Sequence, residues 1–134
     1  LTGDPLTRLE DMGEIVKTIK ESRHGIKFYA KTSGLVVEGD DIRNGILKDV
    51  AGLRGVEVFL PSANPPGYNK AIGPLSQSSG LQKLPPNAIF GRVCEFISAC
   101  SEAGFAVKVG VAEGDRESGK LGRALGAIDV VVYK

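Results

Sequence analysis

The stretch Phe105-Ala106-Val107-Lys108-Val109-Gly110-Val111 decides the fold, because it predicts a β-strand between two helical patterns. The helical pattern before it begins at Asn87 and stops before Gly104, and the turn Ala112-Glu113-Gly114-Asp115 follows it. A short helix then begins at Ser118 or a neighbour. A strand placed between helices in this way belongs to a βα unit, from which parallel sheets are built.

The same unit is repeated on both sides of this stretch. A helix runs from Leu9 to about His24-Gly25, and a second helix runs from Ile42 to Leu53 and is closed by Gly55. The apolar stripe of the first helix consists of Leu9, Met12, Ile15, Val16 and Ile19. The other predicted strands are Ile26–Lys31, Val56–Leu60 and Ile128–Tyr133.

The order α-βα-βα-βα-β predicts an α/β fold with four parallel strands in sequential order and helices on one face, because crossovers between parallel strands are right-handed. The 134 residues, of which 42% are apolar, are enough for a single domain with one core. One segment breaks the pattern: residues 65–86 carry five of the seven prolines and lack periodicity. We predict a long loop there, in which Tyr68, Asn69 and Lys70 either fold over a ligand or are exposed.

Charge and hydropathy exclude several classes of function. A net charge of +1 provides no field that would attract nucleic acid or a membrane surface. No apolar run is long enough to span a membrane, and no export signal is visible, so we expect a cytoplasmic protein. Cys94 and Cys100 lie in one predicted helix, which favours buried reduced thiols over a disulfide or a metal site.

Polar turns follow the carboxyl ends of three predicted strands: Thr32-Ser33-Gly34, Ser62-Ala63-Asn64 and Ala112-Glu113-Gly114-Asp115. In α/β folds ligands bind at this side of the sheet. The loop Thr2-Gly3-Asp4-Pro5 is expected to complete the same cleft, although its residues are also good helix-start residues. The alternative for each segment is an ordinary turn or cap, and Glu113 in particular is either a cleft carboxylate or a solvated turn residue.

The order of these segments resembles that of radical S-adenosylmethionine enzymes. Thr2-Gly3-Asp4-Pro5-Leu6 resembles their Gly-Gly-Glu-Pro segment, with Asp in place of Glu. Lys31-Thr32-Ser33-Gly34 resembles the Thr-Asn-Gly turn that closes their next strand, and Ser62-Ala63-Asn64 is similar to their Ser-x-Asn/Asp segment. The resemblance spans most of the chain and is nearest to the relatives linked to TatD-type deoxyribonucleases.

The resemblance implies a full or partial (β/α) barrel that binds S-adenosylmethionine. Carbonyl groups near Gly3 and Asp4 would hold the methionine amino group, Ser62 or Asn64 would approach the ribose, and residues 109–114 would flank the adenine. The residues that we assign to this cofactor are Gly3, Asp4, Pro5, Thr32, Ser33, Ser62, Asn64 and Glu113.

One departure from the family concerns catalysis. The family's Cys-x-x-x-Cys-x-x-Cys motif precedes its Gly-Gly-Glu-Pro segment, and this chain begins at that segment, with Leu1. Its two cysteines do not make up the three thiolates that a [4Fe–4S] cluster of this kind requires. We therefore expect a fragment that lacks an amino-terminal segment or a cluster-less descendant, and not a competent radical enzyme as given.

Two functions follow from these expectations. The first is binding of S-adenosylmethionine or a related nucleotide-like ligand at the carboxyl ends of the strands. The second is a structural or protein-interaction module, because the strand Ile26–Lys31 is expected at an exposed sheet edge that invites pairing with another chain, including a second copy. An enzyme that uses Asp4 and Glu113 as acid and base is a third alternative.

Overall fold

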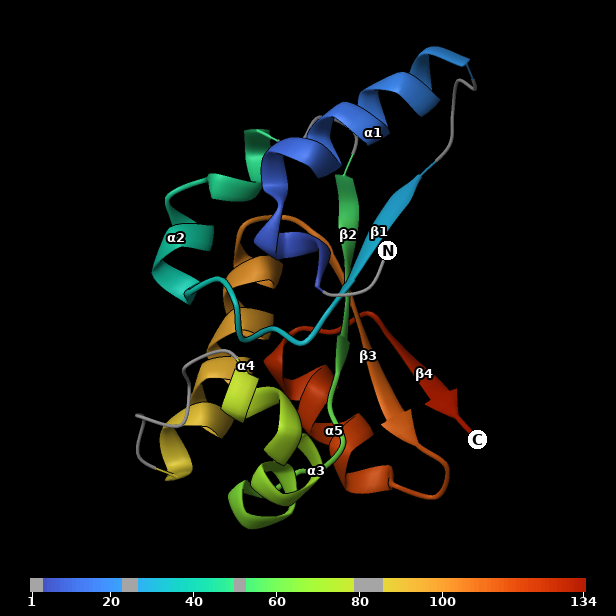
Figure 1. Cartoon of the computed structure of the whole chain (residues 1–134). Coiled ribbons are helices and arrows are strands. Elements are labelled where there is room, and N and C mark those ends of the chain that lie inside the picture. Colours follow the sequence, from blue (N-terminus) through green and yellow to red (C-terminus); the bar gives the residue numbers. More distant parts are fainter. Residues whose placement is uncertain (1–3, 23–26, 50–52, 79–85) are drawn as a thin grey trace.

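A computed structural model describes residues 4–22, 27–49, 53–78 and 86–134 of the chain. Within these residues the sheet has four strands in the order β1-β2-β3-β4, and all three neighbouring pairs are parallel (Figure 1). This architecture confirms the predicted α/β fold and its sequential strand order. The strands are β1 Phe28–Thr32, β2 Leu53–Phe59, β3 Ala106–Ala112 and β4 Asp129–Tyr133.

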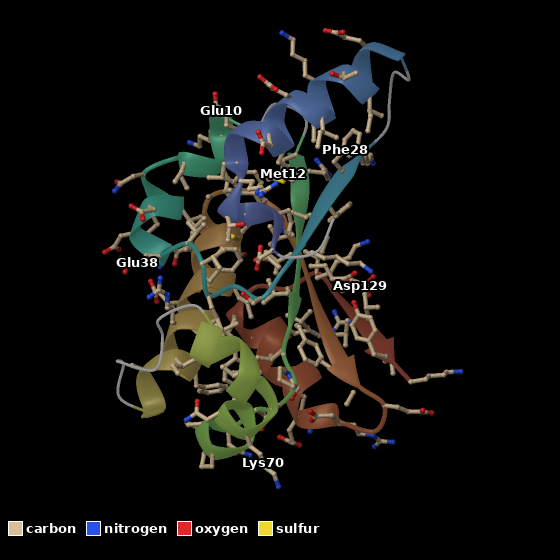
Figure 2. The ribbon with its side chains drawn as sticks, in the orientation of Figure 1. Glu10, Met12, Phe28, Glu38, Lys70 and Asp129 are labelled. Atoms are coloured by element: carbon tan, nitrogen blue, oxygen red, sulfur yellow. The ribbon has the colours of Figure 1, made fainter. Side chains whose placement is uncertain are left out.

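The helices lie before, between and after the first three strands in the chain. Short 3-10 helices are η1 Pro5–Thr7 and η2 Ile46–Asp49, and the α-helices are α1 Leu9–Ser22, α2 Gly39–Arg43, α3 Pro65–Ser78, α4 Pro86–Glu102 and α5 Arg116–Leu125. The amphipathic character predicted for α1 is visible in Figure 2, where Met12 points toward the sheet and Glu10 points away from it.

Helices α4 and α5 cover the same face of the sheet. Gly34, in the loop after β1, fits between Val58 of β2 and Val93 of α4, since a Cβ atom at Gly34 would lie 3.1 Å from a methyl carbon of each. Gly122 of α5 packs directly on Val109 of β3, where an added Cβ would be 2.5 Å from a valine methyl. Val58 and Val109 are register partners and therefore lie on one face. The core is formed between this face and the helices.

Valines dominate the buried face because successive side chains of a strand alternate between the two faces. Val56, Val58, Val107 and Val109 are fully buried, and burial of each contributes about 1.5–3 kcal/mol. The opposite face, which we call the open face, carries no helix from the residues that the structure describes. By the same register its side chains are Tyr29, Lys31, Glu57, Phe59, Lys108, Asp129, Val131 and Tyr133.

The predicted second helix, from Ile42 to Leu53, is wrong in extent. Helix α2 ends at Arg43, because Gly45 adopts a φ of +93°, which a right-handed helix does not allow. The four-residue helix η2 follows, and Leu53 already belongs to β2. Gly55 is also not a helix terminator: it lies in β2, where a Cβ atom would be 1.9 Å from the carbonyl oxygen of Ala106.

The predicted long loop over residues 65–86 is also wrong, because α3 occupies Pro65–Ser78. Two consecutive prolines begin this helix, at positions that need no intrahelical N–H donor. Tyr68 and Ile72, one helical turn apart, are buried at 1% and 3% exposure, and the Tyr68 ring lies 5.5 Å from that of Phe90 in α4. Tyr68 is therefore a core residue rather than part of a lid.

Other predicted element boundaries differ by one to three residues or lie outside the described residues. Helix α5 begins at Arg116 instead of Ser118, because Asp115 caps it and accepts hydrogen bonds from Ser118 N at 3.1 Å and Ser118 Oγ at 2.6 Å. The predicted end of the first helix at His24-Gly25, and the predicted start of the first strand at Ile26, are outside the described residues.

Candidate functional site

Asp4 joins the amino-terminal turn to the carboxyl end of β1, two segments that the sequence analysis assigned to the same site. Its Oδ1 accepts a hydrogen bond from Leu6 N at 3.0 Å, which caps η1. Its Oδ2 accepts bonds from Thr32 Oγ1 at 2.7 Å, Ser33 N at 2.8 Å and Ser33 Oγ at 3.0 Å. Both oxygens are thus engaged within the protein, and Asp4 positions this loop.

The loop after β1 is fixed by the same group of hydrogen bonds. Thr32 is buried at 6% exposure, and its Oγ1 accepts a bond from Gly34 N at 3.1 Å. Gly34 has a φ of +75° and no space for a side chain, so glycine is required at this turn. Of the predicted cofactor residues, Asp4, Thr32 and Ser33 therefore form one cluster, Pro5 lies next to it at the start of η1, and Gly3 lies outside the described residues.

Ser62 and Asn64 lie just before α3, and their hydrogen bonds are local. Asn64 Oδ1 accepts a bond from Gly67 N at 2.9 Å, and Ser62 Oγ accepts one from Asn64 N at 3.2 Å. These bonds satisfy donors near the start of the helix. Both residues follow the carboxyl end of β2, as predicted, but no hydrogen bond among the described residues joins them to the Asp4 cluster.

Glu113 occupies the exposed turn between β3 and α5. Its backbone N–H donates to the carbonyl oxygen of Tyr133 at 3.1 Å, which places Glu113 beside the end of β4. The carboxylate is exposed, so the structure leaves it available to a ligand at this end of the sheet. Asp115, the last residue of the predicted turn, is occupied by the cap of α5.

A network on the open face was not predicted from the sequence. The Tyr133 ring crosses over Gly110, where an added Cβ would lie 2.3 Å from the ring, and makes an edge-to-face pair with Phe59 at a centroid distance of 6.2 Å. Tyr133 Oη donates a hydrogen bond to Glu57 Oε2, and this bond raises the pKa of Tyr133 to about 12. Phe59 and Tyr133 remain 44% and 40% exposed.

Two lysines surround this network. Lys31 Nζ lies 3.8 Å from Glu57 Oε2, and Lys108 Nζ lies 4.3 Å from the centroid of the Tyr29 ring, within cation–π range. The signal that would have found these residues is the period-two alternation of the strands, because Lys31, Glu57 and Lys108 all occupy positions facing away from the valine face.

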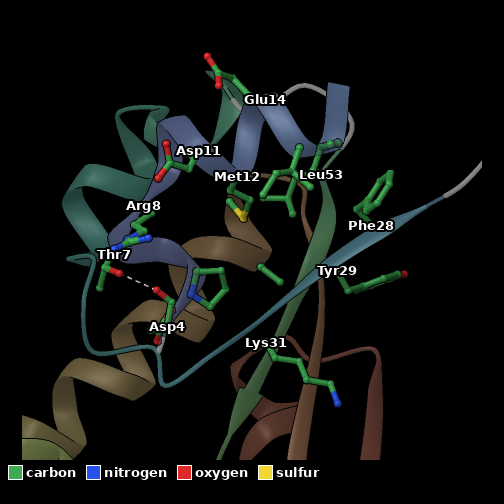
Figure 3. Close-up of a pocket in the computed structure, with 14 residues that line it drawn as sticks. Asp4, Thr7, Arg8, Asp11, Met12, Glu14, Phe28, Tyr29, Lys31 and Leu53 are labelled. Atoms are coloured by element: carbon green, nitrogen blue, oxygen red, sulfur yellow. Dashed lines mark hydrogen bonds between the residues drawn. The ribbon is translucent and has the colours of Figure 1, made fainter. Parts of the chain in front are cut away.

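A hollow of about 1080 Å³ runs beside β1, between that strand and α1 (Figure 3). It includes Asp4 and Pro5 of the predicted site, but Thr32, Ser33, Ser62, Asn64 and Glu113 are not among its lining residues. Among the residues that the structure describes, β1 pairs with β2 alone, so the hollow follows the other edge of β1. This hollow therefore lies at the sheet edge, and most of the predicted site residues at the carboxyl ends of the strands lie outside it. Its apolar lining includes Met12, Ile15, Phe28 and Leu53.

The cysteines behave as buried thiols of α4. Cys100 is fully buried, and burial raises its pKa to about 12; Cys94 is half-buried, and its pKa is raised for the same reason. The described parts of the chain contain no group of three His, Cys, Asp or Glu side chains arranged to hold a metal ion. None of the described helices is long and apolar enough to cross a membrane.

The chain matches no protein-family model and no curated protein sequence.

Proposed function

We propose that this chain binds S-adenosylmethionine or a related nucleoside at the carboxyl ends of its strands, and that it does so without an iron–sulfur cluster of its own. The observation that carries this proposal is the exposed aromatic pair of Phe59 and Tyr133, located at the carboxyl ends of β2 and β4. Exposed aromatic rings of this kind stack with purine bases.

Polar side chains of other strand ends would bind the ribose and the carboxylate of such a ligand. Glu113 follows β3 and bonds through its N–H to the carbonyl of Tyr133, and carboxylates accept hydrogen bonds from ribose hydroxyls. Lys31, whose side chain is 76% exposed, offers an ammonium to the ligand's carboxylate. Asp4 contributes indirectly, because it holds the Thr32-Ser33 turn in place.

The resemblance to radical S-adenosylmethionine enzymes supports the same ligand class. It rests on the segments at Thr2-Gly3-Asp4-Pro5, Thr32-Ser33-Gly34 and Ser62-Ala63-Asn64. The chain's own residues then bind and orient the ligand. Reductive cleavage of the ligand is outside the proposal, because the two cysteines of α4 are separated by more than one helical turn, and one of them, Cys100, is fully buried.

Calorimetric titration of the purified chain with S-adenosylmethionine, and separately with S-adenosylhomocysteine, tests the proposal. Phe59→Ala should weaken binding by about tenfold or more, since stacking on an aromatic side chain contributes about 1–3 kcal/mol per base. Ile46→Ala is the matched control, because Ile46 is an exposed apolar residue of η2, outside the sheet. No heat of binding at millimolar ligand, or equal losses in the two variants, would refute the proposal.

A further inference from the structure

The open face and the two edge strands of the sheet have the properties of a protein–protein interface. Parallel sheets are almost always covered on both faces, yet the described residues cover only one. Seven large apolar side chains are exposed in the described part of the chain, and six of them belong to the sheet's open face or flank its edges. They are Ile15 and Ile19 of α1, Phe59 of β2, Ile128 just before β4, and Val132 and Tyr133 of β4.

Charges alternate from strand to strand across the open face. Lys31 of β1 pairs in register with Glu57 of β2, Glu57 pairs with Lys108 of β3, and Lys108 pairs with Asp129 of β4. One row of the sheet therefore reads positive, negative, positive, negative. The edge strand β1 contributes a positive charge to this row and the other edge strand, β4, contributes a negative one.

We propose that two copies of this chain associate through their sheet edges, with β1 of each copy next to β4 of the other. In this arrangement the two-fold axis runs parallel to the strands, so all strands of both copies stay parallel. We call each place where β1 of one copy lies next to β4 of the other a junction. At both junctions a positive charge lies next to a negative one, so the alternation continues. The other symmetric choice, β1 against β1 or β4 against β4, makes the two edge strands antiparallel and brings together two edges that carry the same charge, Lys31 with Lys31 or Asp129 with Asp129 where the axis passes beside that residue. Like charges on adjacent strands are destabilising.

The apolar residues at the two edges favour the same arrangement. Val132 faces the helix side of the sheet, since its register partner Val111 is buried there, but Val132 itself is 53% exposed. Ile15 of α1 lines the hollow beside β1 and is 47% exposed. Placing β4 of a second copy along this hollow brings Val132 to the side of the sheet on which α1 lies, and water is then excluded from both residues.

This arrangement also removes the unpaired edges. Each copy contributes four parallel strands, so two junctions give a closed ring of eight, with the open face turned inward and the carboxyl ends together at one mouth. The association does not depend on the ligand proposed above. Calorimetry tests ligand binding, and the mass of the purified chain in solution tests the dimer.

Analytical ultracentrifugation of four proteins tests this inference: the natural chain, Lys31→Glu, Asp129→Lys and, as a matched charge reversal outside the sheet, Lys48→Glu in η2. The natural chain and Lys48→Glu should be dimers. Lys31→Glu and Asp129→Lys should each dimerise about tenfold more weakly or worse, because both junctions then hold like charges. An equimolar mixture of these two variants should regain the dimer, since each junction of the mixed pair holds opposite charges.

A natural chain that stays monomeric up to millimolar concentration would overturn the inference, as would single variants that dimerise like the natural chain or a mixture that does not recover. Amide hydrogen exchange of the natural chain gives a second measurement that needs no variant. Amides of β1 and β4 should become protected as concentration rises, while those of α2 should not change. Protection of β1 and β4 that is independent of concentration would contradict the proposed junction.

Discussion

Asp4 and Thr32 are 28 positions apart in the sequence, and a hydrogen bond of 2.7 Å joins Thr32 Oγ1 to Asp4 Oδ2. Because the same oxygen also accepts from Ser33 N and Ser33 Oγ, one carboxylate holds the turn at the end of β1 against η1. The local cap predicted for Asp4 and the tertiary contact use different oxygens of the same side chain.

Asp4→Asn should destabilise the fold by about 1–3 kcal/mol, because it replaces a charged acceptor of several hydrogen bonds by an amide that cannot accept all of them. Urea denaturation measures this loss as a lower midpoint at unchanged slope. Glu14→Gln is the control, since Glu14 is an exposed acid of α1, and it should change stability by less than about 0.5 kcal/mol. Equal effects of the two substitutions would contradict the role assigned to Asp4.

Gly110→Ala should displace the Tyr133 ring, because the new Cβ would lie 2.3 Å from Tyr133 Cε2. The bond to Glu57 and the pair with Phe59 should both be lost, and binding of a nucleoside should weaken with them. Gly91→Ala is the matched control: Gly91 is an exposed residue of α4 with nothing within 4 Å of an added Cβ. It should raise stability by about 0.5–1 kcal/mol. Tyrosine resonances in an NMR spectrum distinguish the two outcomes.

Tyr133 should titrate at a higher pH than an ordinary tyrosine, because its hydrogen bond to Glu57 raises the pKa to about 12. A raised folded-state pKa means that this bond stabilises the fold fully below about pH 10. Its contribution is lost as the pH rises from about 10 to about 12. Phenolate absorbance of the natural chain, compared with Tyr133→Phe, isolates this residue. Glu57→Gln should move the transition to lower pH, and an unchanged transition would argue against the bond.

The two thiols should be unreactive in the folded protein at neutral pH, because burial raises the pKa of Cys100 to about 12 and also raises that of Cys94. A chromogenic disulfide reagent should react with both only after denaturant is added. Cys100→Ser should cost about 1–3 kcal/mol, since it places a hydroxyl at a fully buried position, and Cys94→Ser should cost less. Rapid labelling of Cys100 in the native chain would contradict this packing.

The sequence predicted the strand order well but two segments poorly, and the reasons are physical. For residues 65–78, prolines and glycines masked a helix whose inward positions, Tyr68 and Ile72, are stabilised by packing on α4. For Ile42–Leu53, apolar spacing suggested one helix, whereas Gly45 breaks it and Leu53 pairs with Phe28 in the sheet.

The candidate site was predicted in part. Asp4, Thr32 and Ser33 meet, because the Asp4 carboxylate at the start of η1 accepts hydrogen bonds from the end of β1. Ser62 and Asn64 make local bonds at the start of α3 instead. The predicted apolar stripe of the first helix included Ile15 and Ile19, which the described fold leaves exposed. A helical period shows that such residues form a stripe, but it does not show what covers that stripe.

The amino-acid sequence by itself determined the alternation of helices and strands and, through the fixed handedness of crossovers, the parallel sequential sheet. The apolar periodicity of each segment and the chirality of the backbone are local properties, so the order of helices and strands can be predicted without knowledge of tertiary contacts. Only the tertiary structure decided which side chains meet, such as Tyr133 and Glu57, which are 76 positions apart. That contact depends on strand register and on the missing side chain of Gly110, which lets the tyrosine ring lie across the sheet.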